Sequence, residues 1–174
     1  MEYSNLQQQA ASLKKNLFDQ GYLDEQFCQI EDLQDEASPN FTEEVVSLFF
    51  KNSTRLMTNI EQAMDRNPRD FSKWDVNMQQ LKGTCSSIGA CRMKNECTSF
   101  RNRCGDENVE GSLTLSLPGS YSVCNFHFDF FFCCMRSFQN LKREHGVLRQ
   151  KLESYFQLLR QAGPAVTATR PRGM

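Results

Sequence analysis

The sequence lacks several features that define common functional classes. Its eight cysteines contain no CxxC pair and its only histidines are His127 and His145, so the paired spacing of a structural zinc site is absent. No apolar run reaches the roughly 20 residues of a membrane span, and the polar start MEYSNLQQQAASLKK lacks the apolar stretch of a signal peptide. The net charge of −1 offers no cationic cluster for nucleic acid. We expect an intracellular protein with free thiols that uses no metal, cofactor, membrane or nucleic acid.

Apolar residues recur at steps of three and four along most of the chain, which is the period of a buried helix face. The stripes are Leu6, Ala10, Leu13 and Leu17; Leu23, Phe27 and Ile30; Phe41, Val45, Leu48, Phe49, Leu56, Ile60 and Met64; Trp74, Met78, Leu81, Cys85 and Ile88; Met93, Cys97, Phe100 and Cys104; and Phe138, Leu141, His145, Leu148, Leu152, Tyr155 and Leu159. This pattern predicts an all-α fold. We expect N-terminal helices in 1–35, a helical bundle in 36–162 and a disordered Pro/Gly-rich tail in 163–174.

Residues 112–133 break the helical pattern and form an irregular insert. Their sequence, SLTLSLPGSYSVCNFHFDFFFC, has one charged side chain, Asp129. The leucines at 113, 115 and 117 alternate, as do the phenylalanines at 126, 128 and 130, with Pro118-Gly119-Ser120 between them. An alternating pattern on both sides of a turn predicts strands in a hairpin, and β-prone apolar segments of this kind favour aggregation.

The insert also separates residues that would otherwise share one helical stripe. When 112–133 are removed, Val109 and Cys134 come to lie three positions apart, and Phe138 follows after four. One hypothesis is that the segment is translated intron sequence, because FDFFFCC is what a pyrimidine-rich tract would encode. The alternative is a genuine surface insertion between two helices. In either case we expect the bundle to fold around a poorly placed insert, since a longer surface loop costs only about 0.6 kcal/mol per doubling of its length.

The segment Gln79–Ala90, QQLKGTCSSIGA, resembles the signature of plant histidine-containing phosphotransfer (HPt) proteins, His-Gln-Leu/Phe-Lys-Gly-Ser-Ser-Ser-Ser-Ile/Val-Gly-Ala. The downstream run RMKNECTSFRNRC, the segment NFTEEVVSLFF near residue 40 and ESYFQLL near the C-terminus also resemble that family. The resemblance covers the chain except 112–133 and the tail. It implies a four-helix bundle of the HPt type, preceded by additional N-terminal helices.

The helical period divides the signature segment into two faces. Trp74, Met78, Leu81, Cys85 and Ile88 take the core side, which leaves Asp75, Gln79, Lys82, Gly83 and Ser86 on the solvent side. Glycine in mid-helix costs about 1 kcal/mol relative to alanine, which is reasonable if a partner approaches closely at this point. Lys82 can supply a cation to a phosphoryl group or an aspartate, although without the motif it reads as an ordinary surface lysine.

The chain departs from the family at the phospho-accepting position, where Gln79 replaces histidine. A neutral imidazole has an available lone pair and a pKa of about 6.5, so it can attack an aspartyl phosphate near neutral pH. The amide nitrogen of glutamine has its lone pair delocalised into the carbonyl. His145 lies on an apolar stripe and reads as a packing residue, and His127 lies in the insert without the Lys-Gly context. We therefore predict no catalytic residue.

The resemblance implies a pseudo-HPt protein of a plant two-component phosphorelay, the cytokinin pathway, in the cytosol and nucleus. Its partners would be the receiver domains of sensor histidine kinases and response regulators, which it would bind as a monomer and as a negative regulator. The docking surface would centre on Gln79, Gln80, Lys82, Gly83 and Ser86. The alternative is a phosphorelay mediator that passes phosphate between kinases and response regulators, which requires an acceptor histidine.

Overall fold

The chain folds into six helices, seen in a computed structural model that describes residues 2–68, 70–113 and 123–163. They are α1 (Glu2–Asp19), α2 (Glu25–Asp32), α3 (Phe41–Arg66), α4 (Phe71–Ile88), α5 (Cys91–Leu113) and α6 (Val123–Ala162). Within the described residues, the only β-type pairing is an isolated antiparallel bridge between Leu23 and Ala90. The prediction of an all-α fold is confirmed.

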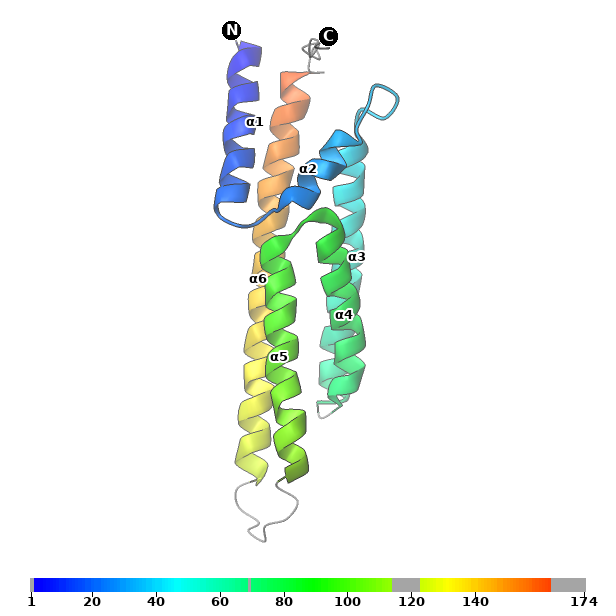
Figure 1. Ribbon diagram of the computed structural model, residues 1–174, viewed down its shortest axis with the longest axis vertical. Helices are drawn as coiled ribbons and strands as arrows, with labels where there is room; N and C mark the ends of the chain where they lie inside the picture. The colour runs from blue at the N-terminus through cyan, green and yellow to red at the C-terminus, as the bar shows by residue number, and fades with distance from the viewer. Residues whose placement is uncertain (1, 69, 114–122, 164–174) are drawn as a thin grey trace, which may run out of the picture.

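Helices α3 to α6 form an up-and-down bundle, and the two N-terminal helices cover one end of it (Figure 1). Helix α1 packs along the C-terminal half of α6, and α2 crosses the end of α4 and contacts α3. The polar side chains of Lys14 and Tyr155 both bind the Glu31 carboxylate, which joins α1, α6 and α2; the tyrosine hydroxyl donates at 2.7 Å. None of the helices in the described parts of the chain is long and apolar enough to cross a membrane.

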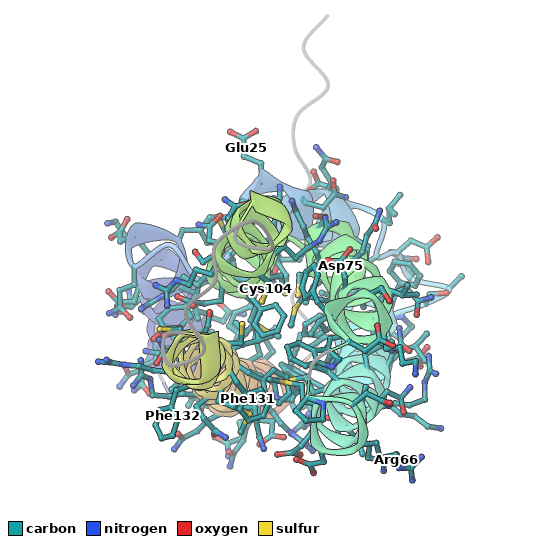
Figure 2. All side chains as sticks on the ribbon, turned by 90° about the horizontal axis from the view of Figure 1, so that it is seen from below. Glu25, Arg66, Asp75, Cys104, Phe131 and Phe132 are labelled. Atoms are coloured by element: carbon teal, nitrogen blue, oxygen red, sulfur yellow. The ribbon has the colours of Figure 1, made fainter. Side chains whose placement is uncertain are left out.

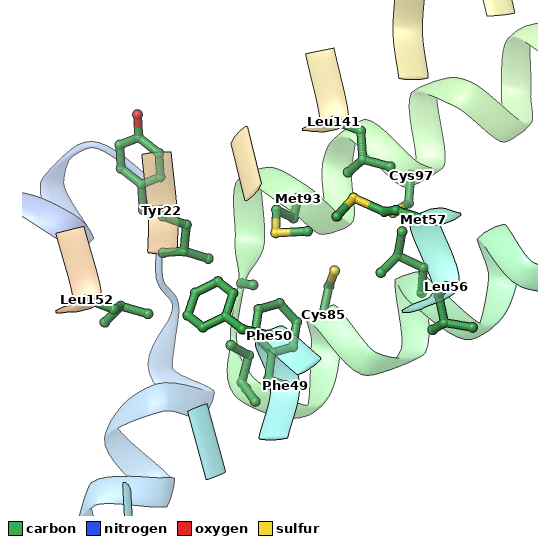
Figure 3. Close-up of a cluster of buried hydrophobic side chains, with 14 of the residues drawn as sticks. Tyr22, Phe49, Phe50, Leu56, Met57, Cys85, Met93, Cys97, Leu141 and Leu152 are labelled. Atoms are coloured by element: carbon green, nitrogen blue, oxygen red, sulfur yellow. The ribbon is translucent and has the colours of Figure 1, made fainter. Parts of the chain in front are cut away.

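The core lies where the stripes of all six helices meet. Figure 3 shows part of it, with side chains from α3, α4, α5 and α6 converging around Leu56, Met57, Cys85, Met93, Cys97 and Leu141. Most of the predicted stripe residues are buried, but Leu48 is 67 % exposed. Its prediction as a core residue was wrong because Val46 and Phe49 occupy the core side of α3, and Leu48 lies about 100° from Phe49 on the helix.

The prediction of strands in the insert was wrong for its second half. Phe126, Phe128 and Phe130 belong to α6, which starts at Val123, while Leu115 and Leu117 lie outside the described residues. An isolated two-stranded hairpin is marginal in water, whereas a helix pairs its own backbone groups. Continuing α6 backward also brings Phe131 into register with Cys134, Phe138 and Leu141 at steps of three, four and three.

The insert therefore extends two helices: residues 112–113 end α5, and residues 123–133 begin α6. Val109 belongs to α5 and Cys134 to α6, two antiparallel helices that reach beyond the α3–α4 connection (Figure 1). The Sγ atoms of Cys104 and Cys134 are 2.8 Å apart in the interior between these helices. Seen end-on in Figure 2, Phe132 lies on the outside, where it is 62 % exposed. The coding origin of the segment stays a hypothesis.

Candidate functional site

Helix α4 presents the signature segment, and burial divides its residues as predicted. Trp74, Met78, Leu81, Cys85 and Ile88 are at most 2 % exposed, and the Trp74 indole N–H donates to the Asn67 carbonyl at 3.1 Å, which fixes the start of the helix. Gln79, Gln80 and Gly83 are exposed, and Lys82 and Ser86 are half-buried. The apolar stripe thus turns the candidate docking residues outward.

Gln79 is available to a partner. Its side chain makes no hydrogen bond with any residue that the structure describes. Four residues along α4, a Cβ built on Gly83 would meet no atom within 4 Å outside the helix's own nearby backbone. The fold therefore does not require glycine at this position, which leaves close approach by another molecule as a reason for it.

The hydroxyl groups around Gln79 are committed to the helix backbone. Thr84 donates to the Gln80 carbonyl at 2.8 Å, Ser86 to the Lys82 carbonyl at 3.1 Å, and Ser87 to the Thr84 carbonyl at 2.8 Å. Such bonds occupy the hydroxyl protons. The side-chain donors of this surface left for a partner are the amides of Gln79 and Gln80 and the ammonium of Lys82.

Asp75 is placed differently from the sequence prediction. Instead of facing solvent beside Gln79, its half-buried carboxylate receives two hydrogen bonds from Arg101 of α5, at 2.5 and 3.1 Å. This ion pair raises the pKa of Arg101. Because the arginine fork holds both carboxylate oxygens, Asp75 adds little net negative charge to the face that carries Gln79.

The last residues of the signature serve the fold. Gly89 ends α4 with φ +74°, a left-handed conformation that favours glycine. A Cβ there would lie 2.5 Å from Asp24 Oδ1 and 2.9 Å from the Phe27 nitrogen. The α1–α2 connection approaches this closely because the Asp24 N–H donates to the Gly89 carbonyl at 2.9 Å. Sequence reasoning missed this role, although a glycine at the end of an apolar stripe is a signal for a helix end.

His145, the histidine whose side chain the structure describes, is not placed as an acceptor. His145 is 7 % exposed, its Nε2 lies 2.9 Å from Ser53 Oγ, and its ring packs edge-on against Phe50. Burial, assisted by the nearby charge of Arg149, lowers the pKa of His145 to about 4. The prediction of a packing histidine is confirmed. His127 belongs to α6, and its side chain lies outside the described residues.

A hollow of about 440 Å³ lies between α3 and α6, away from the residues of α4. Its lining is Glu43, Val46, Ser47, Phe50, Lys51, Thr54, Arg149, Leu152, Glu153, Phe156 and Arg160. Gln79, Gln80 and Gly83 lie outside this hollow on the exposed face of α4, and an exposed helix face suits a protein partner better than a small substrate.

The similarity of the chain to known proteins establishes its family. The chain is 68 % identical over 173 residues to the pseudo histidine-containing phosphotransfer protein 5 of Oryza sativa subsp. japonica, with 99 % of each chain covered. The chain belongs to the plant HPt family, as a pseudo-HPt member. It is also 36 % identical to the histidine-containing phosphotransfer protein 1 of Arabidopsis thaliana, covering 92 % of this chain and 90 % of that one.

Solved HPt structures share the fold. The protein MtHPt2 from Medicago truncatula superposes with a TM-score of 0.70 at 34 % identity, covering 90 % of this chain and 91 % of that one. No family model matches the chain. The relatives are HPt and pseudo-HPt proteins and support a role in a phosphorelay. In an HPt protein, the residue that matches the phospho-accepting histidine decides whether phosphate can be carried, and the signature of this chain has Gln79 at that position.

Proposed function

We propose that this pseudo-HPt protein binds receiver domains of sensor histidine kinases and response regulators without carrying phosphate. The observation that carries the proposal is the exposed side chain of Gln79 on the outer face of α4, at the position that matches the family's phospho-accepting histidine. A carboxamide can hydrogen-bond a receiver, but its nitrogen lone pair is delocalised into the carbonyl, so it does not act as the nucleophile that accepts a phosphoryl group.

The proposed docking surface comprises Gln79, Gln80, Lys82, Gly83 and Ser86. All five are exposed or half-buried, and the open space over Gly83 allows another backbone to approach. Transient relay contacts bury roughly 1,200 Å² or less in total, so such a contact needs only a small docking surface. We expect the chain to engage one receiver at a time as a monomer.

Occupation of receivers by an inert chain would compete with active HPt proteins. The proposed consequence is negative regulation of a plant two-component relay, the cytokinin pathway, in the cytosol and nucleus. The competing function, a phosphorelay mediator, needs an accessible acceptor, and the buried His145 does not supply one.

The direct test is phosphotransfer from a receiver labelled with radioactive phosphate. We expect no label on the wild-type chain and stable label on Gln79→His, since the imidazole would then stand beside Lys82 and Gly83. Gln80→His is the matched control, because it places an imidazole one position away, about 100° around the helix, and should stay unlabelled. Label on the wild-type chain would establish the mediator function instead.

A further inference from the structure

We infer that this chain binds a receiver in its aspartyl-phosphate form more tightly than the same receiver without phosphate. The inference rests on the proposed receiver binding and names the state of the partner that the site prefers. It comes from the arrangement of charges on the adjacent faces of α4 and α5.

The Asp75–Arg101 ion pair sets the register of these two antiparallel helices. Lys82 follows Asp75 by seven residues on α4, and Lys94 precedes Arg101 by seven residues on α5. At a rise of about 1.5 Å per residue, both lysines lie roughly 10 Å from the ion pair, in the same direction along the bundle. Lys82 and Lys94 therefore flank the same stretch of the α4–α5 boundary, and Gln79 lies between them and the ion pair.

Both lysines keep their charges available. Each is half-buried, and neither forms an ion pair with any residue in the described parts of the chain. Among the acids near these lysines, Asp75, the only acid of α4, is held by Arg101, and Asp24, which approaches Gly89, accepts a hydrogen bond from the Gln26 N–H. Glu96 lies about 200° around α5 from Lys94. The charges of Asp75, Arg101, Lys82 and Lys94 thus sum to +2 along this stretch of the α4–α5 boundary, on a chain whose net charge is −1.

An aspartyl phosphate adds a phosphoryl group with about two negative charges to a receiver. Two ammonium groups and the N–H₂ of Gln79 can donate to its oxygens, while the neighbouring hydroxyl protons are engaged with helix carbonyls. Because position 79 has no nucleophile, no bond forms between phosphorus and this chain, and the acyl phosphate of the receiver stays intact. The added charge increases binding without turnover, so the chain would retain the signalling form of its partner.

The experiment compares the dissociation constants of one receiver with and without beryllium trifluoride, which mimics the aspartyl phosphate, using the full-length chain at low and moderate salt. We expect about tenfold tighter binding of the beryllofluoride form, since one charge-assisted hydrogen bond corresponds to about that factor, and a smaller ratio at higher salt. Lys82→Gln and Lys94→Gln should each reduce the ratio. Lys73→Gln is the matched control, because Lys73 is a lysine of α4 that is paired with Asp70, and it should keep the ratio.

The outcomes separate this inference from the proposed function. Equal affinity for the two states, or a ratio that survives both lysine substitutions, would overturn the inference and leave receiver binding standing. Failure of a panel of plant receivers to bind in either state would overturn the proposed function and the inference together. A ratio that Lys73→Gln lowers as much as Lys82→Gln would contradict the local site and indicate a long-range charge effect.

Discussion

At the scale of single residues, two glycines of the signature segment differ in role, because the fold requires glycine at position 89 but not at position 83. Gly89 has a positive φ and no room for a Cβ, whereas Gly83 is helical with open space around it. We expect Gly89→Ala to lower the free energy of unfolding by about 2–4 kcal/mol, from backbone strain and overpacking. Gly83→Ala should raise it by about 0.5–1 kcal/mol, because alanine favours helix. Urea denaturation followed by circular dichroism measures both, and a Gly89→Ala variant as stable as wild type would contradict the role of the close approach to Asp24.

His145 gives stability a pH dependence of defined sign. Its pKa is about 4 in the folded chain because burial opposes the charge, and about 6.5 when unfolded. Between these values the unfolded state binds more protons, so stability is complete above about pH 6.5 and falls as the pH drops towards 4. The full loss, which is reached below about pH 4, is about 3 kcal/mol. Most of this loss is measured when urea unfolding of wild type and His145→Gln is compared at pH 7 and pH 4.5, since the titrating carboxylates are common to both proteins. Parallel pH profiles for the two proteins would exclude His145 as the cause.

At the scale of helices, the sequence predicted what local periodicity determines. The stripe from Trp74 to Ile88 was enough to place Gln79 and Gly83 on the outer face of α4, since one helix fixes both faces. Contacts between helices could not be predicted this way. The pairing of Asp75 with Arg101 and the approach of Asp24 to Gly89 depend on residues 26 and 65 positions apart, which no local pattern specifies.

The insert was misread for a related reason. An alternating Phe126-Phe128-Phe130 pattern indicates a strand only if a sheet exists to receive it. In this fold the neighbouring element is α6, and extension of that helix brings Phe131 against Trp74, with ring centroids 6.0 Å apart at 66°. Context from the adjoining helix thus outweighed the period of two in a short apolar segment.

At the scale of the whole molecule, the position of the docking helix depends on contacts at both of its ends. The α1–α2 connection holds its C-terminal end through Gly89, and the Cys91 N–H donates to the Tyr22 carbonyl at 3.0 Å just beyond it. The N-terminal end is held by Trp74, which Phe131 of the insert contacts. The N-terminal helices and the insert therefore support the orientation of α4 without contributing to its exposed face.

Removal of residues 112–133 tests whether the bundle needs the insert. The Sγ atoms of Cys104 and Cys134 already lie 2.8 Å apart, so the remaining residues 105–111 must only reconnect two adjacent helices. Seven residues are within the usual length of such connections. We therefore expect the shortened chain to fold with the same helical bundle, and to be more soluble because exposed Phe132 is lost.

Deletion of residues 112–133 should lower the free energy of unfolding mainly because the contact of Phe131 with Trp74 is lost. In the full-length chain, Phe131→Ala should lower the free energy of unfolding by about 1–2 kcal/mol, because half-buried Phe131 packs against buried Trp74. Phe132→Ala, at a position that is 62 % exposed, should change it by no more than about 0.5 kcal/mol. Urea unfolding of the three variants measures these values. Loss of the helical circular dichroism signal in the shortened chain would mean that the bundle depends on the insert. Equal effects of Phe131→Ala and Phe132→Ala on the free energy of unfolding would mean that the Trp74 contact does not stabilise α4.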